Sequence, residues 1–136
     1  MKKFLFIILL TVIAVEVSAK VSVFVVKPKC EYTSDTSTGE TKVIDSPIKY
    51  VSIDDDCNVF FYDDNRRWED VLITKTPEYN DYNRTITYWR VGTLSDKVAM
   101  FDYVNSKIIF GKFNGKTMSE SWIFQIDVEA TKRLDN

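Results

Sequence analysis

Residues 107–126 read KIIFGKFNGKTMSESWIFQI, and this stretch decides the fold class. Asn114-Gly115 stands between two runs in which apolar and polar residues alternate, and this dipeptide tolerates the positive φ that a type I′ hairpin turn requires. In the second run, Trp122 and Phe124 fall on the same face of an extended strand. We therefore expect two antiparallel strands here, with one face buried.

Outward from this hairpin, the chain consists of short β-branched and aromatic runs separated by turn residues, with no apolar stripe of helical period. This pattern predicts an all-β fold, either a small antiparallel β-barrel or a β-sandwich of about seven or eight strands. Pro28 lacks a ladder N–H and is expected to end the first strand. Residues 33–41 and 77–83 are polar and are expected to be loops. The other expected strands are residues 20–26, 48–53, 57–62, 71–74, 84–91 and 97–103.

The first nineteen residues have the pattern of a secretory signal peptide. A cationic start precedes the apolar run Phe4–Val15, and Val17-Ser18-Ala19 supplies the small residues of a cleavage site. The apolar run is too short to span a bilayer as a helix. We therefore expect residues 1–19 to be removed and residues 20–136 to form one β domain. That domain would be periplasmic or secreted, with no membrane insertion after cleavage.

Composition excludes several classes of function. The chain of 136 residues has a formal net charge of −2, which disfavours nucleic acid as a partner. It contains no histidine, so it cannot build a Ser-His-Asp triad, a Cys-His dyad or an imidazole metal site. We expect no catalytic residue and no cofactor.

Cys30 and Cys57 are the two cysteines of the chain. An oxidising compartment favours pairing them, and we expect a Cys30–Cys57 disulfide. Closing a loop of that length would stabilise the fold by about 3.5 kcal/mol through the entropy of the unfolded chain.

Acidic residues suggest two possible functions, a calcium-stabilised structural module and a glycan hydrolase. Asp54, Asp56 and Asp63 could bind calcium through oxygen ligands, which would make the chain a calcium-stabilised structural module. An EF-hand loop beginning at Asp54 fails, because Val59 replaces the required glycine and Asn65 replaces the bidentate glutamate. We therefore expect no metal, and solvated turns at these residues.

The second alternative is a glycan hydrolase, whose chemistry needs two carboxyl groups and no histidine. Glu69 and Asp70 beside Trp68, and Glu120 beside Trp122, are the local candidates. Such carboxylates are more often surface charges, so the glycan hydrolase is kept only as an alternative to a non-catalytic domain.

Tyr79 and Tyr82 lie in the polar segment 77–83, where no neighbouring residue gives a reason to bury two rings. Tyrosine combines a large contact area with a polar hydroxyl, which suits a binding surface. The sequence therefore predicts a non-catalytic secreted domain that binds a protein, a glycan or a small ligand through this loop. The next residues, Asn83-Arg84-Thr85, also match the sequon for N-glycosylation in a eukaryotic host.

Overall fold

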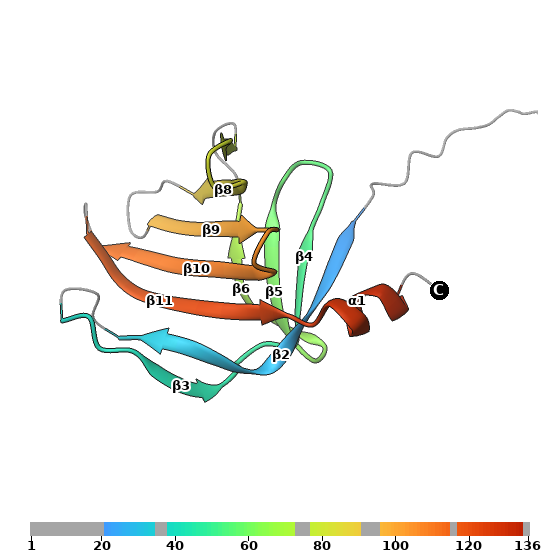
Figure 1. Cartoon of the computed structure of the whole chain (residues 1–136), viewed down its shortest axis with the longest axis horizontal. Coiled ribbons are helices and arrows are strands. Elements are labelled where there is room, and N and C mark those ends of the chain that lie inside the picture. The colour runs from blue at the N-terminus through green and yellow to red at the C-terminus, as the bar shows by residue number, and fades with distance from the viewer. Residues whose placement is uncertain (1–20, 35–37, 73–76, 91–95, 115–116, 135–136) are drawn as a thin grey trace, which may run out of the picture.

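The computed structural model describes residues 21–34, 38–72, 77–90, 96–114 and 117–134 (Figure 1). These residues form ten strands and one short helix, and every strand pairing is antiparallel, which confirms the all-β fold class. The predicted signal peptide lies outside the described residues. The strands are β2 (Ser22–Thr33), β3 (Lys42–Asp45), β4 (Tyr50–Ile53), β5 (Val59–Asp63), β6 (Arg66–Val71), β7 (Glu78–Asn80), β8 (Thr85–Arg90), β9 (Asp96–Asp102), β10 (Lys107–Asn114) and β11 (Thr117–Ile126), and the helix is α1 (Val128–Leu134).

One continuous sheet has the strand order β6-β5-β4-β2-β11-β10-β9-β8-β7, and β3 pairs with β2. Strand β2 belongs to two parts of this sheet, because Ser22–Val25 pairs with β4 whereas its later residues pair with β11 and β3. We call β4–β6 with this first half of β2 the small layer, and β3, β7–β11 and the second half of β2 the large layer. The sheet folds over along β2, so that the small layer covers part of one face of the large layer (Figure 1).

The sheet is not closed, because β6 and β7 end the strand order and do not pair with each other. Of the two expected architectures, the closed barrel is therefore wrong, and the expected count of seven or eight strands is too low. The additional strands β3 and β7 are only four and three residues long. Neither is long enough to show a clear alternation of apolar and polar residues.

Strand β2 continues through Pro28, where the sequence predicted its end. The ladder with β4 ends at Val25 and the ladder with β3 begins at Lys29, so Pro28 lies where the strand changes partner. Its carbonyl accepts a hydrogen bond from the Ser46 N–H at 2.7 Å, and no ladder requires the missing N–H. Proline is tolerated at such an irregularity.

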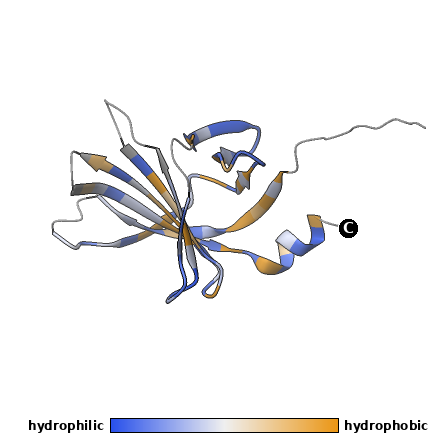
Figure 2. Cartoon of the chain, turned by 90° about the horizontal axis from the view of Figure 1, so that it is seen from above, coloured by the Kyte–Doolittle hydropathy of each residue, from blue (hydrophilic) through white to orange (hydrophobic). Residues whose placement is uncertain are grey.

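The core lies between the two layers and consists mainly of aromatic rings. Phe61 of β5 lies 4.9 Å from Phe110 and 6.0 Å from Phe124 of the large layer, measured between ring centroids, and none of the three is exposed. Burying each such side chain contributes about 1.5–3 kcal/mol. Trp122 is also buried, which confirms the expected inward face of the last strand. Figure 2 shows the alternation of hydrophobic and hydrophilic residues along the strands that produces these buried faces.

A β-bulge in β6 turns two adjacent residues toward the core. Phe61 pairs with Glu69 and Tyr62 with Arg67, so Trp68 is the extra residue in the ladder. Trp68 packs edge-on against Phe110 at 5.7 Å between ring centroids. Glu69 follows directly and reaches lysines of the large layer.

Near the C-terminus, residues 128–134 form α1, and none of its residues is buried. The Thr131 hydroxyl accepts a hydrogen bond from the Val25 N–H at 2.9 Å, which attaches the helix to β2. Among the described residues, no helix has the length and apolar content needed to cross a membrane.

Candidate functional site

The two tyrosines predicted to bind a ligand lie on the hairpin formed by β7 and β8, at the edge of the large layer. Tyr79 is 58% exposed and Tyr82 is 98% exposed. Tyr79 is the central residue of β7, and Tyr82 lies in the turn that leads to β8. The sequence thus identified two of the most exposed aromatic residues among those the structure describes.

Hydrogen bonds within the turn fix the position of Tyr82. The Asn80 side-chain oxygen Oδ1 accepts hydrogen bonds from the Tyr82 N–H at 2.9 Å and from the Asn83 N–H at 3.4 Å. The Arg84 N–H donates to the Asn80 carbonyl at 2.8 Å, and Arg84 has a φ of 59°. Asparagine favours this local bonding, and a single left-handed residue closes the turn. The Tyr82 ring is therefore exposed on a turn whose backbone is held by hydrogen bonds, so a ligand would not have to order that backbone.

A surface hollow of about 470 Å³ lies beside this turn. Thr85 and Thr87 of β8 contribute buried side chains to it, with 5% and 8% exposure. The Thr85 hydroxyl donates to Asn83 Oδ1 at 2.7 Å, whereas the Thr87 hydroxyl has no hydrogen-bond partner among the described residues. The residues that line the hollow are Glu78, Tyr79, Asn80, Asp81, Tyr82, Asn83, Thr85, Thr87 and Met100.

The two tyrosines do not occupy equivalent positions. Tyr79 pairs with Ile86, whereas Glu78 pairs with Thr87 and lies on the opposite face of the two-stranded ladder. Strand alternation therefore directs the Tyr79 side chain away from the face that carries Thr87. Tyr82 is the aromatic residue of the turn itself, and Tyr79 borders the hollow from the strand.

The expected Cys30–Cys57 disulfide is not formed, and both thiols are free. Cys57 lies in the β4–β5 turn, beyond the Ile53–Ser22 pair at the start of β2. Cys30 lies eight residues farther along β2, which corresponds to about 26 Å of extended strand. A disulfide requires Cα atoms within about 7 Å of each other. Burial, followed by the charge of Glu31, raises the pKa of the Cys30 thiol to about 11.

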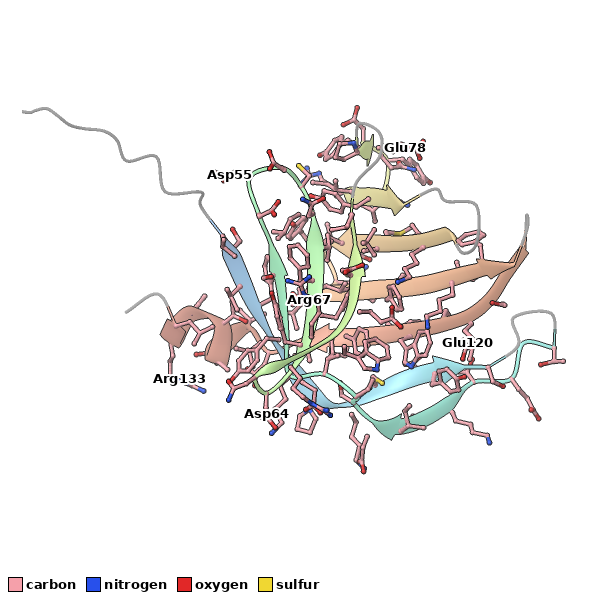
Figure 3. The ribbon with its side chains drawn as sticks, turned by 180° about the vertical axis from the view of Figure 1, so that it is seen from behind. Asp55, Asp64, Arg67, Glu78, Glu120 and Arg133 are labelled. Atoms are coloured by element: carbon pink, nitrogen blue, oxygen red, sulfur yellow. The ribbon has the colours of Figure 1, made fainter. Side chains whose placement is uncertain are left out.

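The acidic residues considered for calcium lie in two separate turns. Asp54 and Asp56 lie at the β4–β5 turn, and Asp63 lies at the other end of β5. Figure 3 shows this separation through Asp55 and Asp64, which are labelled at the turns before and after β5. The Asp54 Oδ1 accepts hydrogen bonds from two backbone N–H groups of its own turn, each at 2.9 Å. Among the described residues, no three candidate ligands of the His, Cys, Asp and Glu types are grouped for a metal ion.

Glu69, one of the hydrolase candidates, is held between two lysines of the large layer. Lys97 and Lys112 each place Nζ 2.8 Å from one of its carboxylate oxygens, and the three side chains are 13–31% exposed. Burial alone would raise the pKa of Glu69, but the hydrogen bonds from Lys112 and Lys97 outweigh it and hold that pKa below its usual range. Glu69 therefore stays ionised at neutral pH and is unsuited to donate a proton.

Glu120, the other hydrolase candidate, lies across the β10–β11 ladder from Lys112. It accepts a hydrogen bond from the Tyr32 hydroxyl. That hydrogen bond, together with burial, raises the pKa of Tyr32 above its usual range. Lys112 Nζ also lies 5.7 Å from the centroid of the Trp122 ring. Lysines, a tyrosine and two glutamates thus form one polar edge of the core.

Sequence reasoning missed the partners of these acids and the burial of Thr87. A turn centred on Asn114-Gly115 would pair Lys112 with Thr117, whereas the ladder pairs Asn114 with Thr117 and, after a register shift, Lys112 with Glu120. Asp70, the other acid named beside Trp68, forms an ion pair with Arg67 at 3.7 Å. No feature of the sequence relates Glu69 to Lys97, because their contact joins the two layers.

No protein-family model, curated protein or solved structure matches the chain.

Proposed function

We propose that this chain is a non-catalytic binding domain that holds its ligand at the β7–β8 hairpin. The observation that carries the proposal is Tyr82, which is 98% exposed on a turn fixed by its own hydrogen bonds. A tyrosine that binds a partner contributes a large area of ring surface and a hydroxyl for hydrogen bonding. Aromatic residues of this kind dominate the energy of many interfaces.

The geometry around Tyr82 supports this assignment over a purely structural role. A ring that stabilised the fold would pack against other side chains, as Phe61 and Trp68 do in the core. Tyr82 instead borders a hollow whose lining includes the buried Thr87. The Asn80 side-chain oxygen accepts hydrogen bonds from the Tyr82 and Asn83 N–H groups, and these bonds hold the backbone that carries the Tyr82 ring.

Export is part of the same proposal. The leader pattern of residues 1–19 predicts that the domain acts outside the cytoplasm, where it would meet its ligand. We propose no catalytic role for Glu69 or Glu120, because both carboxylates are engaged by neighbouring side chains.

Native mass spectrometry of the chain purified from its own host tests the proposal. The wild type should retain a bound mass that the Tyr82→Ala variant loses. Tyr103→Ala is a matched control, because Tyr103 is also exposed, at 45%, but lies near the β9–β10 turn, away from the hairpin. A bound mass that survives Tyr82→Ala, or that Tyr103→Ala removes equally, would contradict the proposal.

A further inference from the structure

We infer that the hollow beside Tyr82 binds an uncharged carbohydrate. This inference rests on the proposed function, and it adds the chemical class of the ligand. A carbohydrate presents many hydroxyl groups, each of which can donate and accept hydrogen bonds, together with apolar C–H faces. A site for it therefore needs fixed donors, fixed acceptors and an aromatic ring within a small area.

The turn supplies the donors. Asn80 and Asn83 each use Oδ1 as an acceptor inside the hairpin, and the Nδ2 groups of both side chains have no hydrogen-bond partner among the described residues. An amide NH₂ group provides two N–H donors. Both amides line the hollow, and their internal hydrogen bonds hold them in place. A ligand hydroxyl can therefore be bound there with little further ordering of the protein.

Acceptors come from Asp81 and Thr87. Asp81 is exposed and lines the hollow. Thr87 is only 8% exposed, and the described residues offer its hydroxyl no hydrogen bond. Buried polar groups in native proteins are normally satisfied by the protein, by ordered water or by a ligand. A hydroxyl that both donates and accepts would satisfy Thr87 when a sugar occupies the hollow.

Charge selects among carbohydrates. Asp81 is an exposed acidic residue of the lining, and no basic residue is among the described residues that line the hollow. A sulfated or uronic-acid sugar would meet this negative charge, whereas a neutral sugar would not. An apolar ligand is also disfavoured, because Met100 is the only aliphatic side chain among the lining residues that the structure describes.

Isothermal titration of the purified chain against three sets of probes tests this inference. The first set is neutral oligosaccharides of hexose and N-acetylhexosamine, the second is their sulfated forms, and the third is extended peptides of mixed sequence. We expect binding in the first set alone. Tyr82→Ala should weaken that binding about tenfold or more, as loss of a central aromatic residue does. Thr87→Val removes only the hydroxyl and should weaken it about fivefold, while Tyr103→Ala leaves it unchanged.

The outcomes separate this inference from the proposed function. Binding of sulfated sugars or peptides in place of neutral sugars, lost in Tyr82→Ala, would overturn the carbohydrate inference and leave the binding site standing. Neutral-sugar binding that Tyr82→Ala and Thr87→Val do not affect would overturn both. Failure of all three probe sets would overturn the carbohydrate inference, and the native mass measurement on Tyr82→Ala would then decide the proposed function.

Discussion

Thr87 is the residue at which stability and binding are expected to oppose each other. Its hydroxyl is buried without a partner among the described residues, and valine has nearly the same shape. We expect Thr87→Val to raise the free energy of unfolding by up to about 1 kcal/mol, because valine keeps the shape and removes a hydroxyl that makes no hydrogen bond with the described residues. Urea unfolding measures this change. A clear loss of stability would mean that the hydroxyl serves the fold and would argue against its role in the hollow.

The two cysteines are expected to differ in their reactivity toward an alkylating reagent. Cys30 is 3% exposed and has a pKa of about 11, whereas Cys57 is half-buried in a turn. Because the thiolate is the reactive species, iodoacetamide should label Cys57 in the native protein and Cys30 only after unfolding. A reducing agent should leave the melting temperature unchanged. Denatured, unreduced protein that takes up no label would show that the two cysteines are paired.

Single residues could be predicted from the sequence where the alternation was clear. Trp122 and Phe124 were placed in the core because their strand alternates without interruption. Tyr82 was expected to be exposed because its polar neighbours offer no burial. Thr87 was missed because a threonine in an alternating strand gives no sign of whether its hydroxyl finds a partner.

Among the elements, β6 connects the aromatic core to the charged edge through its bulge. Trp68 contacts Phe61, Phe110, Trp122 and Phe124, with ring centroids 5.2–6.3 Å apart. We expect Trp68→Ala to lower the free energy of unfolding by about 3 kcal/mol, since it leaves a cavity at the joint of the layers. Trp68→Phe keeps part of the packing and should cost less. Equal unfolding midpoints for wild type and Trp68→Ala in urea would contradict this role.

Element boundaries were less predictable than element types. The hairpins β4–β5 and β10–β11 were expected, because turn residues separate clear strands. The alternation of Ala99, Phe101 and Tyr103 correctly favoured a strand over a helix for β9. The short strands β3 and β7 could not be recognised, because four and three residues are too few to show an alternation of apolar and polar side chains. The passage of β2 through Pro28 depends on a change of partner strand that no local pattern reveals.

For the whole molecule, the ion pairs of Glu69 with Lys97 and Lys112 join the two layers. We expect Glu69→Gln to cost about 2 kcal/mol at neutral pH, because two partly buried ammonium groups lose their carboxylate. The folded-state pKa of Glu69 is lowered, so its contribution is present above the ordinary carboxyl pKa of about 4.3 and is lost as pH falls through the folded value.

Chemical denaturation at several pH values checks this dependence. The difference between wild type and Glu69→Gln should be constant from neutral pH to about pH 5 and should shrink below about pH 4. Glu40→Gln serves as the control, because Glu40 is exposed and should change stability by less than about 0.5 kcal/mol. A difference that grows in acid would show that the ion pairs do not stabilise the fold.

The arrangement of the layers could not be predicted from the sequence. Alternation defines which residues are buried, but a barrel and a folded-over sheet bury the same faces. The outcome depends on which strands lie at the edges, and β7 is too short to close a barrel against β6. The predicted disulfide was also wrong. The distance between Cys30 and Cys57 depends on the course of β2, which local sequence patterns do not reveal.

Amide chemical-shift mapping by NMR tests the binding site most directly. The chain would be titrated with the neutral oligosaccharide that binds best, or with the molecule released from host-purified protein. We predict that the largest changes in amide chemical shift fall on residues 78–87, which form the β7–β8 hairpin. Shifts confined to the edge around Glu69 and Glu120, with the hairpin unchanged, would contradict it.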